Sequence, residues 1–379
     1  MISPFIINDK NLFLDRFPVV QVNRSLQAWD ASDEYLVNYI EQQQLINSDT
    51  KLLIMNDDFG AISVNFLQQQ VITVSDSFIS EQGLKHNIEQ NNLSAERFSP
   101  LSSLAELPDD IDVILYKIPK NKNLLAEQLI EIKNSISSKA IFIAADKAKN
   151  IQTSTLKLFE KYLGTTKTSL AVKKSRLVFC QLDSKQAFSN PQIKSWPLEN
   201  TPFSITNRAN VFAREKLDIG ARLFIKHLPE LTNDKSVIDL GCGNGVIGLS
   251  LLKQSPLTRI SFIDESYMAV QSAQDNVHNN IIDAEKNCQF IVNDCLTDVE
   301  AAGTDVILCN PPFHQQNATT DHIAWQMFKD SYRALKKGGE LRIVGNRQLG
   351  YHIKLKRIFG NERLIASNDK FVILSAIKR

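Results

Sequence analysis

A glycine-rich turn in the second half of the chain carries the clearest chemical signature. Residues 239–245, Asp-Leu-Gly-Cys-Gly-Asn-Gly, follow an apolar run typical of a β-strand, and Val246 begins a segment of helical periodicity. Glycine has no Cβ, so the backbone can turn tightly there and approach a ligand closely. Asp264 follows the next apolar run about 20 residues later, the spacing at which an acidic residue accepts hydrogen bonds from both ribose hydroxyls. The turn therefore predicts a site for a nucleoside-containing ligand.

Two cofactors satisfy this arrangement. Residues 243–248 form G-x-G-x-x-G, the pattern of NAD-binding turns, in which the helix N-terminus holds a pyrophosphate. Asp239 has no role in that arrangement, whereas S-adenosylmethionine places an ammonium group where this acidic side chain is favourable. Asp294 follows the third apolar run and is then placed to accept a hydrogen bond from the adenine amino group. A helix cap or a loop acid is the alternative for Asp294.

A second group of candidate residues ends another apolar run. Residues 305–309 are typical of a short buried strand, and Asn310, Pro311, Pro312 and Phe313 follow at once. Proline fixes φ and lacks an N–H, so the two prolines stiffen the loop and hold its acceptor groups in place. A strand that simply ends in prolines, with a phenylalanine in the core, is the alternative. Beside the glycine turn, the pattern favours a functional site.

The elements that must position these residues follow from periodicity. From residue 236 onwards, apolar runs alternate with amphipathic segments, and 322–339 is typical of a helix ending in glycines. Residues 359–379 contain two short strands around an Asn-Asp turn, which indicates a hairpin. Repeated β–α units followed by a terminal hairpin predict a mostly parallel sheet with helices on both faces.

The first half of the chain repeats this order of elements. KLLIMNDDFGAIS parallels SVIDLGCGNGVIG, VITVSDSF parallels ISFIDESY, and DVILYKIPK parallels DVILCNPPF. Matching the acidic residue near the end of each second run pairs Asp76 with Asp264, and Asn87 lies near the place of Asn276. The offsets drift only from about 185 to 200 residues, as loop insertions would produce. Two further segments also match: KAIFIAADK parallels GELRIVGNR, and YLGTTKTSLAVKKSRLVFCQL parallels IFGNERLIASNDKFVILSAIK. Five matches in the same order predict an internal duplication.

The two copies differ at the candidate sites. The glycine turn has become Asn-Asp-Asp-Phe-Gly at 56–60, and Asn-Pro-Pro-Phe has become Lys-Ile-Pro-Lys at 117–120. We therefore expect the first copy to keep the fold and to have lost the site. The stretch between the copies contains prolines and lacks clear periodicity. The predicted boundaries are a first domain at 1–185, a linker at 186–204 and a second domain at 205–379.

Charge is unevenly distributed along a chain whose net charge is +1. Residues 1–116 contain 6 Lys and Arg against 17 Asp and Glu, whereas residues 117–185 contain 14 against 5. A basic segment in a neutral protein suggests a polyanionic partner such as RNA, and a solvated lysine-rich face is the alternative. The candidate RNA contacts are Lys117, Lys120, Lys122, Lys173, Lys174 and Arg176.

The composition narrows the class of protein. A chain of 379 residues is long for one hydrophobic core, so two domains are expected. The five cysteines have no paired spacing and the six histidines are scattered, so we expect neither a disulfide framework nor a metal site. No apolar stretch approaches the roughly 18 residues of a membrane span, and the first residues lack the pattern of a signal peptide. We expect a cytoplasmic monomer that binds no membrane.

The motifs together resemble a known family. DxGxGxG with NPPF is similar to class I S-adenosylmethionine-dependent methyltransferases that act on nitrogen. NPPFH, the helix HIAWQMFKDSYRALKKGGEL and the degenerate first copy resemble the bacterial rRNA guanine-N2 methyltransferases, most closely those of 23S rRNA, over nearly the full length. The resemblance implies an α/β protein of two tandem class I methyltransferase-like domains. Each would be Rossmann-like with a seven-stranded sheet, the first degenerate and RNA-binding, the second catalytic.

The resemblance also implies roles for individual residues. S-adenosylmethionine would be bound by Asp239, Gly241, Gly243, Gly245, Asp264 and Asp294, with Phe212 and Arg214 closing over it. Alternatively, Leu217, Ile219 and Leu223 belong to an ordinary helix that packs on the sheet, with Phe212 as its hydrophobic staple. Guanine N2 is a weak nucleophile because its lone pair is delocalised into the ring. The Asn310 side-chain oxygen and the Pro311 carbonyl would accept its two N–H groups and aim the lone pair, and Phe313 would stack on the base.

The expected function is therefore methylation of guanine N2 in 23S rRNA, and the resemblance implies the guanine at position 1835. A 16S rRNA guanine is the nearest alternative because those enzymes share the duplication and the motif. Enzymes that methylate adenine N6 or a glutamine amide also carry an NPP-aromatic motif, although a protein substrate would not require the basic first domain. A non-catalytic rRNA assembly factor would fail to bind S-adenosylmethionine, and a nicotinamide-linked oxidoreductase would bind nicotinamide cofactors instead.

Overall fold

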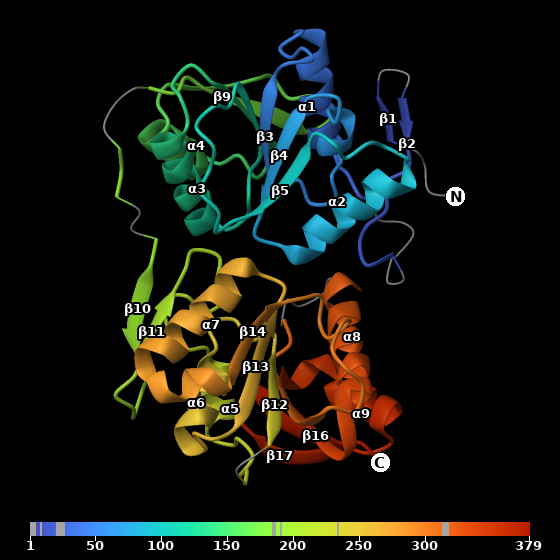
Figure 1. Ribbon diagram of the computed structural model, residues 1–379, viewed down its shortest axis with the longest axis vertical. Helices are drawn as coiled ribbons and strands as arrows, with labels where there is room; N and C mark the ends of the chain where they lie inside the picture. The colour runs from blue at the N-terminus through green and yellow to red at the C-terminus, as the bar shows by residue number, and fades with distance from the viewer. Residues whose placement is uncertain are drawn as a thin grey trace. The chain divides into compact units, whose positions relative to one another are not determined.

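The computed structural model describes residues 5–7, 10–19, 27–183, 187–189, 192–232, 235–312 and 318–379. The chain divides into two compact units, Met1–Gln192 and Ile193–Arg379 (Figure 1). Each unit contains one seven-stranded sheet and one two-stranded hairpin. We call these units 1 and 2 and describe each by itself. Among the described residues, no helix combines the length and the apolar character that a membrane crossing requires.

Unit 2 is built on a mixed sheet with the strand order β14-β13-β12-β15-β16-β18-β17. Six strands run in the same direction, and β18 is antiparallel to both of its neighbours, β16 and β17. The strands are β12 (Ser236–Leu240), β13 (Arg259–Asp264), β14 (Cys288–Val292), β15 (Thr304–Cys309), β16 (Leu335–Asn346), β17 (Arg363–Ser367) and β18 (Phe371–Ile377). The helices are α5 (Ile219–Ile225), α6 (Val246–Gln254), α7 (Tyr267–Asn280), α8 (Ala318–Ala334) and α9 (Tyr351–Phe359), with 3-10 turns η3 (Ile282–Asn287) and η4 (Arg347–Leu349).

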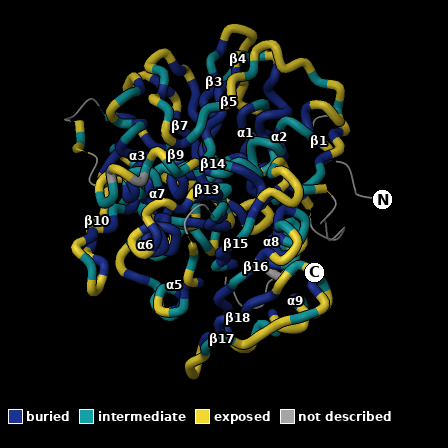
Figure 2. The backbone as a smooth tube through the Cα atoms, turned by 60° about the horizontal axis from the view of Figure 1, so that its bottom comes forward, coloured by how far each residue is buried: buried dark blue, intermediate teal, exposed yellow. Residues whose placement is uncertain are grey.

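The central strands of unit 2 are apolar on both faces because helices cover both. Successive side chains of a strand point to opposite sides. Val237 and Phe262 accordingly enter the core formed with α5, α6 and α7, whereas Ile238 and Ile263 enter the core formed with α8 and α9. Figure 2 shows these strands buried and the connecting loops more exposed. The apolar runs of the sequence therefore correspond to buried strands, as their continuity indicated.

Unit 1 has the same strand order, β5-β4-β3-β6-β7-β9-β8, with β9 antiparallel to both neighbours. In Figure 1, α3 and α4 lie on one side of this sheet, and α1 and α2 on the other. The fold class predicted from the sequence is confirmed. The strands are β3 (Lys51–Met55), β4 (Gln70–Ser75), β5 (Phe98–Ser102), β6 (Val113–Lys117), β7 (Ile141–Lys147), β8 (Thr166–Thr168) and β9 (Ser175–Cys180). The helices are α1 (Ala31–Gln42), α2 (Phe78–Gln90), α3 (Lys122–Ser135) and α4 (Thr153–Tyr162), with a 3-10 turn η2 (Ser63–Asn65).

Strand register relates most positions of one copy to positions of the other. Lys51 pairs with Gln70 in unit 1 as Ser236 pairs with Arg259 in unit 2. Counting along these strands, Ser75 takes the place of Asp264, and Asp76 takes the place of Glu265. The sequence alignment of Asp76 with Asp264 was therefore wrong by one residue, because it matched two acidic side chains instead of two strand ends.

Paired asparagines reveal a further part of the duplication. Asn87 in α2 accepts from Asp15 N–H at 2.8 Å and donates to Asp15 O, and Asn276 in α7 makes the same two bonds to Thr206. Asn91 and Asn280, one helical turn later, repeat the pattern with the backbone of Phe13 and Ser204. Each asparagine pair thus ties a helix to the chain, at the second hairpin strand in unit 2 and just after it in unit 1.

The two hairpins are counterparts of each other. Unit 1 has β1 (Phe5–Ile7) paired with β2 (Lys10–Leu12), and unit 2 has β10 (Lys194–Pro197) paired with β11 (Ser204–Asn207). Strand β10 lies within 186–204, the segment that the sequence predicts to be a linker. Its four residues are too few to establish a period of two, which is why the sequence did not reveal it. The predicted boundaries at 185 and 205 remain predictions.

Candidate functional site

The candidate residues of unit 2 gather along one edge of its sheet. Parallel strands end on the same side, and the order β14-β13-β12-β15 places their carboxyl ends in a row (Figure 1). Asp294 follows β14, Asp264 ends β13, the glycine turn follows β12, and Asn310 follows β15. In open α/β sheets this edge is where ligands bind. The residues singled out from three separate motifs therefore lie side by side.

The glycines of the turn do different things. Gly241, Gly243 and Gly245 have φ of 68°, 54° and 73°, in the left-handed region that favours glycine. A Cβ on Gly245 would lie 2.8 Å from Ala273 Cβ of α7, so Gly245 lets α6 and α7 pack closely. A Cβ on Gly243 would meet nothing within 4 Å. Gly243 therefore borders open space, where the backbone can approach a ligand.

Asp264 is tied to this turn. Its Oδ2 accepts a hydrogen bond from Gly243 N–H at 2.9 Å, and its Oδ1 accepts from Ser266 N–H at 3.1 Å. The second bond belongs to the start of α7, where Ser266 is the N-cap. Asp264 therefore holds the glycine turn close to the end of β13. Its half-buried carboxylate lies at the sheet edge where ligands bind in open α/β sheets.

Asp239 is the most unusual charged group of the site. Its side chain is 0% exposed, and Oδ2 accepts from Gly248 N–H at 2.8 Å. Its Oδ1 is buried and accepts no hydrogen bond from any described residue. Burial raises the pKa of Asp239 to about 7, against the lowering effect of the Gly248 N–H, and the nearby Asp264 raises it further. An oxygen left in this state is stabilised by a ligand that brings a donor or a positive charge.

Asn310 presents a second buried acceptor without a partner. Its Oδ1 is inaccessible to solvent and has no hydrogen bond to the described part of the chain. Its carbonyl oxygen lies 3.8 Å from the position of a Cβ on Gly241, so the residue adjoins the glycine turn. Pro311 is buried and Pro312 is exposed. Phe313 lies outside the described residues.

Asp294 lies at the other end of the row. It is 3% exposed, and its Oδ1 accepts a hydrogen bond from Gln326 Nε2 of α8 at 3.0 Å. Burial raises the pKa of its carboxyl group, against the lowering effect of the Gln326 amide. Asp294 is thus a buried acceptor that is hydrogen-bonded to α8. This differs from a solvent-exposed loop acid, which was one alternative that the sequence left open.

The segment before α5 holds Phe212 and Arg214. Phe212 is 55% exposed, so it does not pack as a hydrophobic staple, and α5 begins only at Ile219. Ala213 has φ of 55°, which turns the chain sharply between them. The Arg214 side chain is 10% exposed and pairs with Glu215, and Trp196 Nε1 donates to Arg214 O at 3.1 Å. The backbone of this segment is therefore held in place while the Phe212 ring faces solvent.

One functional-site feature escaped the sequence analysis. The Asn244 amide donates from Nδ2 to Asn207 Oδ1 at 2.8 Å, and its Oδ1 accepts from Val246 N–H at 3.2 Å, at the start of α6. Asn207 is 0% exposed and also donates to Lys194 O and Ile205 O. Asn276 donates to Asn244 O at 2.9 Å. Three hydrogen-bonded asparagines, from β11, the glycine turn and α7, therefore hold the turn in place.

Unit 1 has a buried ion cluster where unit 2 has this site. Lys117 Nζ donates to Asp33 Oδ1 and lies 3.4 Å from Asp30 Oδ1, and the lysine side chain is only 16% exposed. Lys117 is therefore not available to bind RNA, which corrects that prediction. The other predicted contacts are exposed residues: Lys120, Lys122, Lys173, Lys174 and Arg176. Of these, Lys122 donates to Ser154 Oγ and Lys173 pairs with Glu34.

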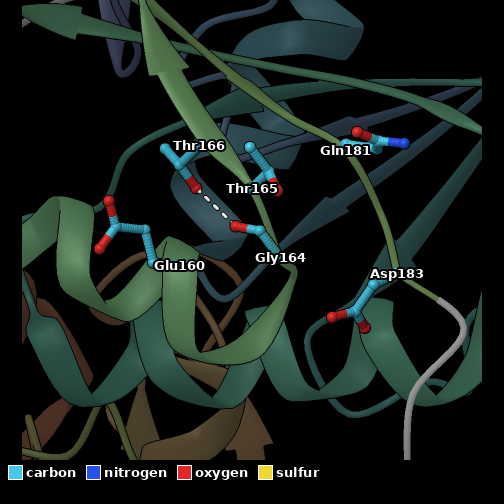
Figure 3. A pocket seen from close by; sticks show the side chains of 6 residues that line it. All are labelled: Glu160, Gly164, Thr165, Thr166, Gln181 and Asp183. Carbon is cyan, nitrogen blue, oxygen red and sulfur yellow. Dashed lines mark hydrogen bonds between the residues drawn. The ribbon is translucent and has the colours of Figure 1, made fainter.

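A hollow in unit 1 lies away from the carboxyl edge of its sheet. Figure 3 shows its lining near the end of α4 and the adjoining ends of β8 and β9, where Thr166 Oγ1 donates to Gly164 O at 3.0 Å. Its lining residues are Glu160, Gly164, Thr165, Thr166, Gln181 and Asp183. None of the candidate residues contributes to it. Within the described residues, no group of three or more His, Cys, Asp or Glu side chains could hold a metal ion.

Comparisons with known proteins identify the family. Residues 3–184 match the RLMG N-terminal domain, and residues 202–375 match the Methyltransferase small domain. A protein from Colwellia psychrerythraea named Ribosomal RNA large subunit methyltransferase G is 62% identical over 100% of both chains. One of the same name from Pseudoalteromonas translucida is 50% identical over 98% of this chain and 97% of its own. The chain belongs to the ribosomal RNA large subunit methyltransferase G family.

A solved structure shares the fold of this methyltransferase G family member. It is described as the T. thermophilus 16S rRNA N2 G1207 methyltransferase (RsmC) in complex with AdoMet and guanosine. The match has a TM-score of 0.75 at 17% identity and covers 100% of this chain and 98% of the other. Membership in the methyltransferase G family confirms the resemblance inferred from the motifs and makes the chain an S-adenosylmethionine-dependent methyltransferase.

Proposed function

We propose that this enzyme transfers a methyl group from S-adenosylmethionine to N2 of a guanine in 23S rRNA, with the guanine at position 1835 as its target. One observation carries the proposal: Asp239 Oδ1 in β12 and Asn310 Oδ1 just after β15 are both buried and bond to no described residue, and these two strands pair directly. The names of the relatives support large-subunit rRNA as the substrate. The 16S rRNA enzyme with the same fold, whose name specifies N2 of guanine, supports the reacting atom.

The residues of the edge fit S-adenosylmethionine. No described residue donates to Asp239 Oδ1, so an ammonium group would supply the missing donor, and Gly243 leaves open space above the turn. Asp264 would accept from the ribose hydroxyls and Asp294 from the adenine amino group, with Phe212 and Arg214 closing over the cofactor. Bound there, S-adenosylmethionine supplies an electrophilic methyl group on a sulfonium.

Asn310 and Pro311 would orient the nucleophile. Asn310 Oδ1 and the Pro311 carbonyl accept the two N–H groups of the amine, which makes the nitrogen more tetrahedral and directs its lone pair. Asn310 Oδ1 is buried and bonds to no described residue, so it accepts this bond without first breaking one to the described part of the chain. The amine becomes acidic as it is methylated, so its proton passes to water and no strong base is needed. Phe313 would stack on the extruded base.

We propose that unit 1 contributes to RNA binding through its exposed cations, and that the enzyme works as a cytoplasmic monomer. The exposed candidates are Lys120, Lys122, Lys173, Lys174 and Arg176. A 16S rRNA guanine is the second candidate target, because the enzyme with the shared fold acts on 16S rRNA.

The test uses purified protein, labelled S-adenosylmethionine, and separated 16S and 23S rRNA from cells that lack the gene. Nucleoside digestion identifies the product, and Asn310→Ala is assayed in parallel. N2-methylguanosine at one 23S site, reduced about 100-fold or more in the variant while cofactor affinity is unchanged, is the expected result. Label found in 16S rRNA alone would show that the substrate is 16S rRNA and not 23S rRNA. A methylated adenine would overturn the assignment of the reacting atom.

A further inference from the structure

The carboxy-terminal part of unit 2 is strongly basic, which the charge analysis of the first half did not reveal. Residues 335–379 contain 11 Lys and Arg against 3 Asp and Glu, whereas residues 1–185 contain 20 against 22. Several lysines of the basic segment 117–185 form ion pairs with acidic residues of unit 1, so part of its positive charge is neutralised. The ion pairs there are Lys117 with Asp30 and Asp33, Lys133 with Asp183, Lys147 with Asp30, and Lys173 with Glu34.

Two exposed cations of the basic part of unit 2 lie at the edge that carries Asn310. Strand β16 ends at Asn346, and Arg347 follows; β18 begins at Phe371, which pairs with Asn346, and Lys370 precedes it. Since β15 and β16 are adjacent and parallel, this end of β16 is also the end of β15 where Asn310 stands. Arg347 and Lys370 therefore flank the proposed base site, two and three strands from the glycine turn in the sheet order.

The backbone fixes both cations at this place. Arg347 N–H donates to Lys370 O at 3.0 Å, and Arg347 Nη2 donates to Asn368 O at 2.7 Å. The ion pairs between described residues include neither Arg347 nor Lys370. The remaining guanidinium donors, and the Lys370 ammonium group 5.6 Å from the Phe371 ring centroid, can therefore meet an anion at the rim of the site.

The first copy supplies an internal comparison. By strand register, Ala148 takes the place of Arg347, and Lys174 takes the place of Lys370. The backbone bond is kept, since Ala148 N–H donates to Lys174 O at 2.8 Å. The turn therefore does not need an arginine for its fold. The arginine is present only in the copy that retains Asn310.

We propose that Arg347 and Lys370 bind the phosphates of nucleotides next to the methylated base. This inference rests on the proposed function, because it takes the RNA substrate from there. A base that leaves its stack to reach Asn310 keeps its own sugar and phosphates at the rim of the pocket. Phosphate is the group that a guanidinium and an ammonium there would bind, and such interactions fix the register of the strand.

The test measures binding of the intact protein to a 23S rRNA fragment over a range of salt concentrations. Arg347→Ala and Lys370→Ala are compared with Arg363→Ala and Lys337→Ala. The two control residues are exposed cations at the opposite, amino-terminal edge of the same sheet. We expect each rim variant to weaken affinity several-fold at low salt and to reduce the salt slope by about 1 for each phosphate that the variant no longer binds. The controls should stay near wild type.

The affinity for S-adenosylhomocysteine, measured by calorimetry, shows whether a variant has lost phosphate binding or has a damaged cofactor site. The rim variants should bind it as tightly as wild type does, because neither residue belongs to the cofactor site. Rim variants with the salt slope of the controls would overturn the phosphate binding, even if the enzyme methylates 23S rRNA. A wild-type protein that binds the fragment through Arg347 and Lys370 but methylates no guanine would instead overturn the proposed function and leave the phosphate binding standing.

Discussion

Lys117 stands in the first sheet at the position that Asn310 holds in the second. Leu52 pairs with Val113 in unit 1 as Val237 pairs with Val306 in unit 2, and both residues follow four positions later. Asn310 follows its strand with an acceptor, Oδ1, that bonds to no described residue, whereas Lys117 ends its strand with an ammonium group bound to Asp30, Ser32 and Asp33 at the start of α1. In unit 1, an ion cluster therefore occupies the position of the residue that we propose orients the amine.

We predict that Lys117→Met destabilises unit 1. Asp33 is 6% exposed, and removing its cation leaves a buried charge without compensation, which typically costs about 3–5 kcal/mol. Hydrogen exchange measured separately over the two units should show the loss in β3, β6 and β7 and spare unit 2. Lys120→Met, at an exposed lysine three residues on, is the control and should leave stability unchanged. If Lys117→Met instead weakened RNA binding at wild-type stability, the ion cluster would not be structural.

The sequence predicted those parts of the site that local rules determine. Asp264, the glycine turn and Asn310 each end an apolar run, and parallel strands bring their ends together, so their neighbourhood followed from periodicity alone. Lys117 could not be placed this way, because its partner Asp33 lies 84 residues earlier in the chain. The Asn207–Asn244 bond spans 37 residues and joins two ordinary-looking amides. Interactions of this kind are set by tertiary packing, for which a single sequence carries no signal.

Two alanine substitutions in the glycine turn should distinguish a glycine that lets the ligand approach from one that lets the helices pack. Gly243→Ala places a methyl group in open space, so it should fold with a strain of about 1 kcal/mol from its left-handed φ and lose cofactor affinity. Gly245→Ala meets Ala273 Cβ at 2.8 Å and should lose about 1–3 kcal/mol more in stability. Urea unfolding and calorimetric binding of S-adenosylhomocysteine measure the two effects. Equal stability of the two variants would contradict this division of roles.

We predict that the Asn207–Asn244 amide pair positions the cofactor turn. Asn207 accepts from Asn244 Nδ2 and so directs Asn244 Oδ1 towards Val246 N–H, next to Gly243 and Gly245. Asn207→Ala and Asn244→Ala should each weaken S-adenosylhomocysteine binding about tenfold and speed exchange of the turn amides in the cofactor-free protein. Because the two amides act together, the double variant should lose little more than either single one. Multiplicative losses in the double variant would show that the residues act independently.

The first copy offers a matched control for this pair. There Arg16 takes the place of Asn207 and Phe59 that of Asn244, and the guanidinium carbon lies 4.9 Å from the ring centroid. The cation–π interaction holds a turn that keeps only Gly60 of the three glycines, so Arg16→Ala should lower the stability of unit 1 by about 0.5–1 kcal/mol. It should leave S-adenosylhomocysteine affinity unchanged. A loss of affinity equal to that of Asn207→Ala would contradict a local role for the amide pair.

Asp239 should make both stability and cofactor affinity depend on pH. Its pKa rises from 3.8 to about 7 on folding, because burial disfavours the charged form. Below pH 4 the carboxyl group is protonated in both states; between pH 4 and 7 it is ionised only in the unfolded chain. The free energy of unfolding should therefore fall as pH rises through that window and level off above pH 7. Asp239→Asn should remove this contribution, as chemical unfolding at a series of pH values would measure.

The same shift predicts a proton linked to cofactor binding. A cationic ammonium beside Asp239 favours the ionised carboxylate, so affinity should rise with pH up to about 7, by at most tenfold per unit, as a proton is released on binding. Calorimetry in two buffers of different ionisation enthalpy counts that proton. Asp57 is the control, because burial also raises its pKa to about 7, but it lies in the copy without the glycine turn. Asp57→Asn should keep the proton release and Asp239→Asn should lose it; release that survives in Asp239→Asn would place the ammonium elsewhere.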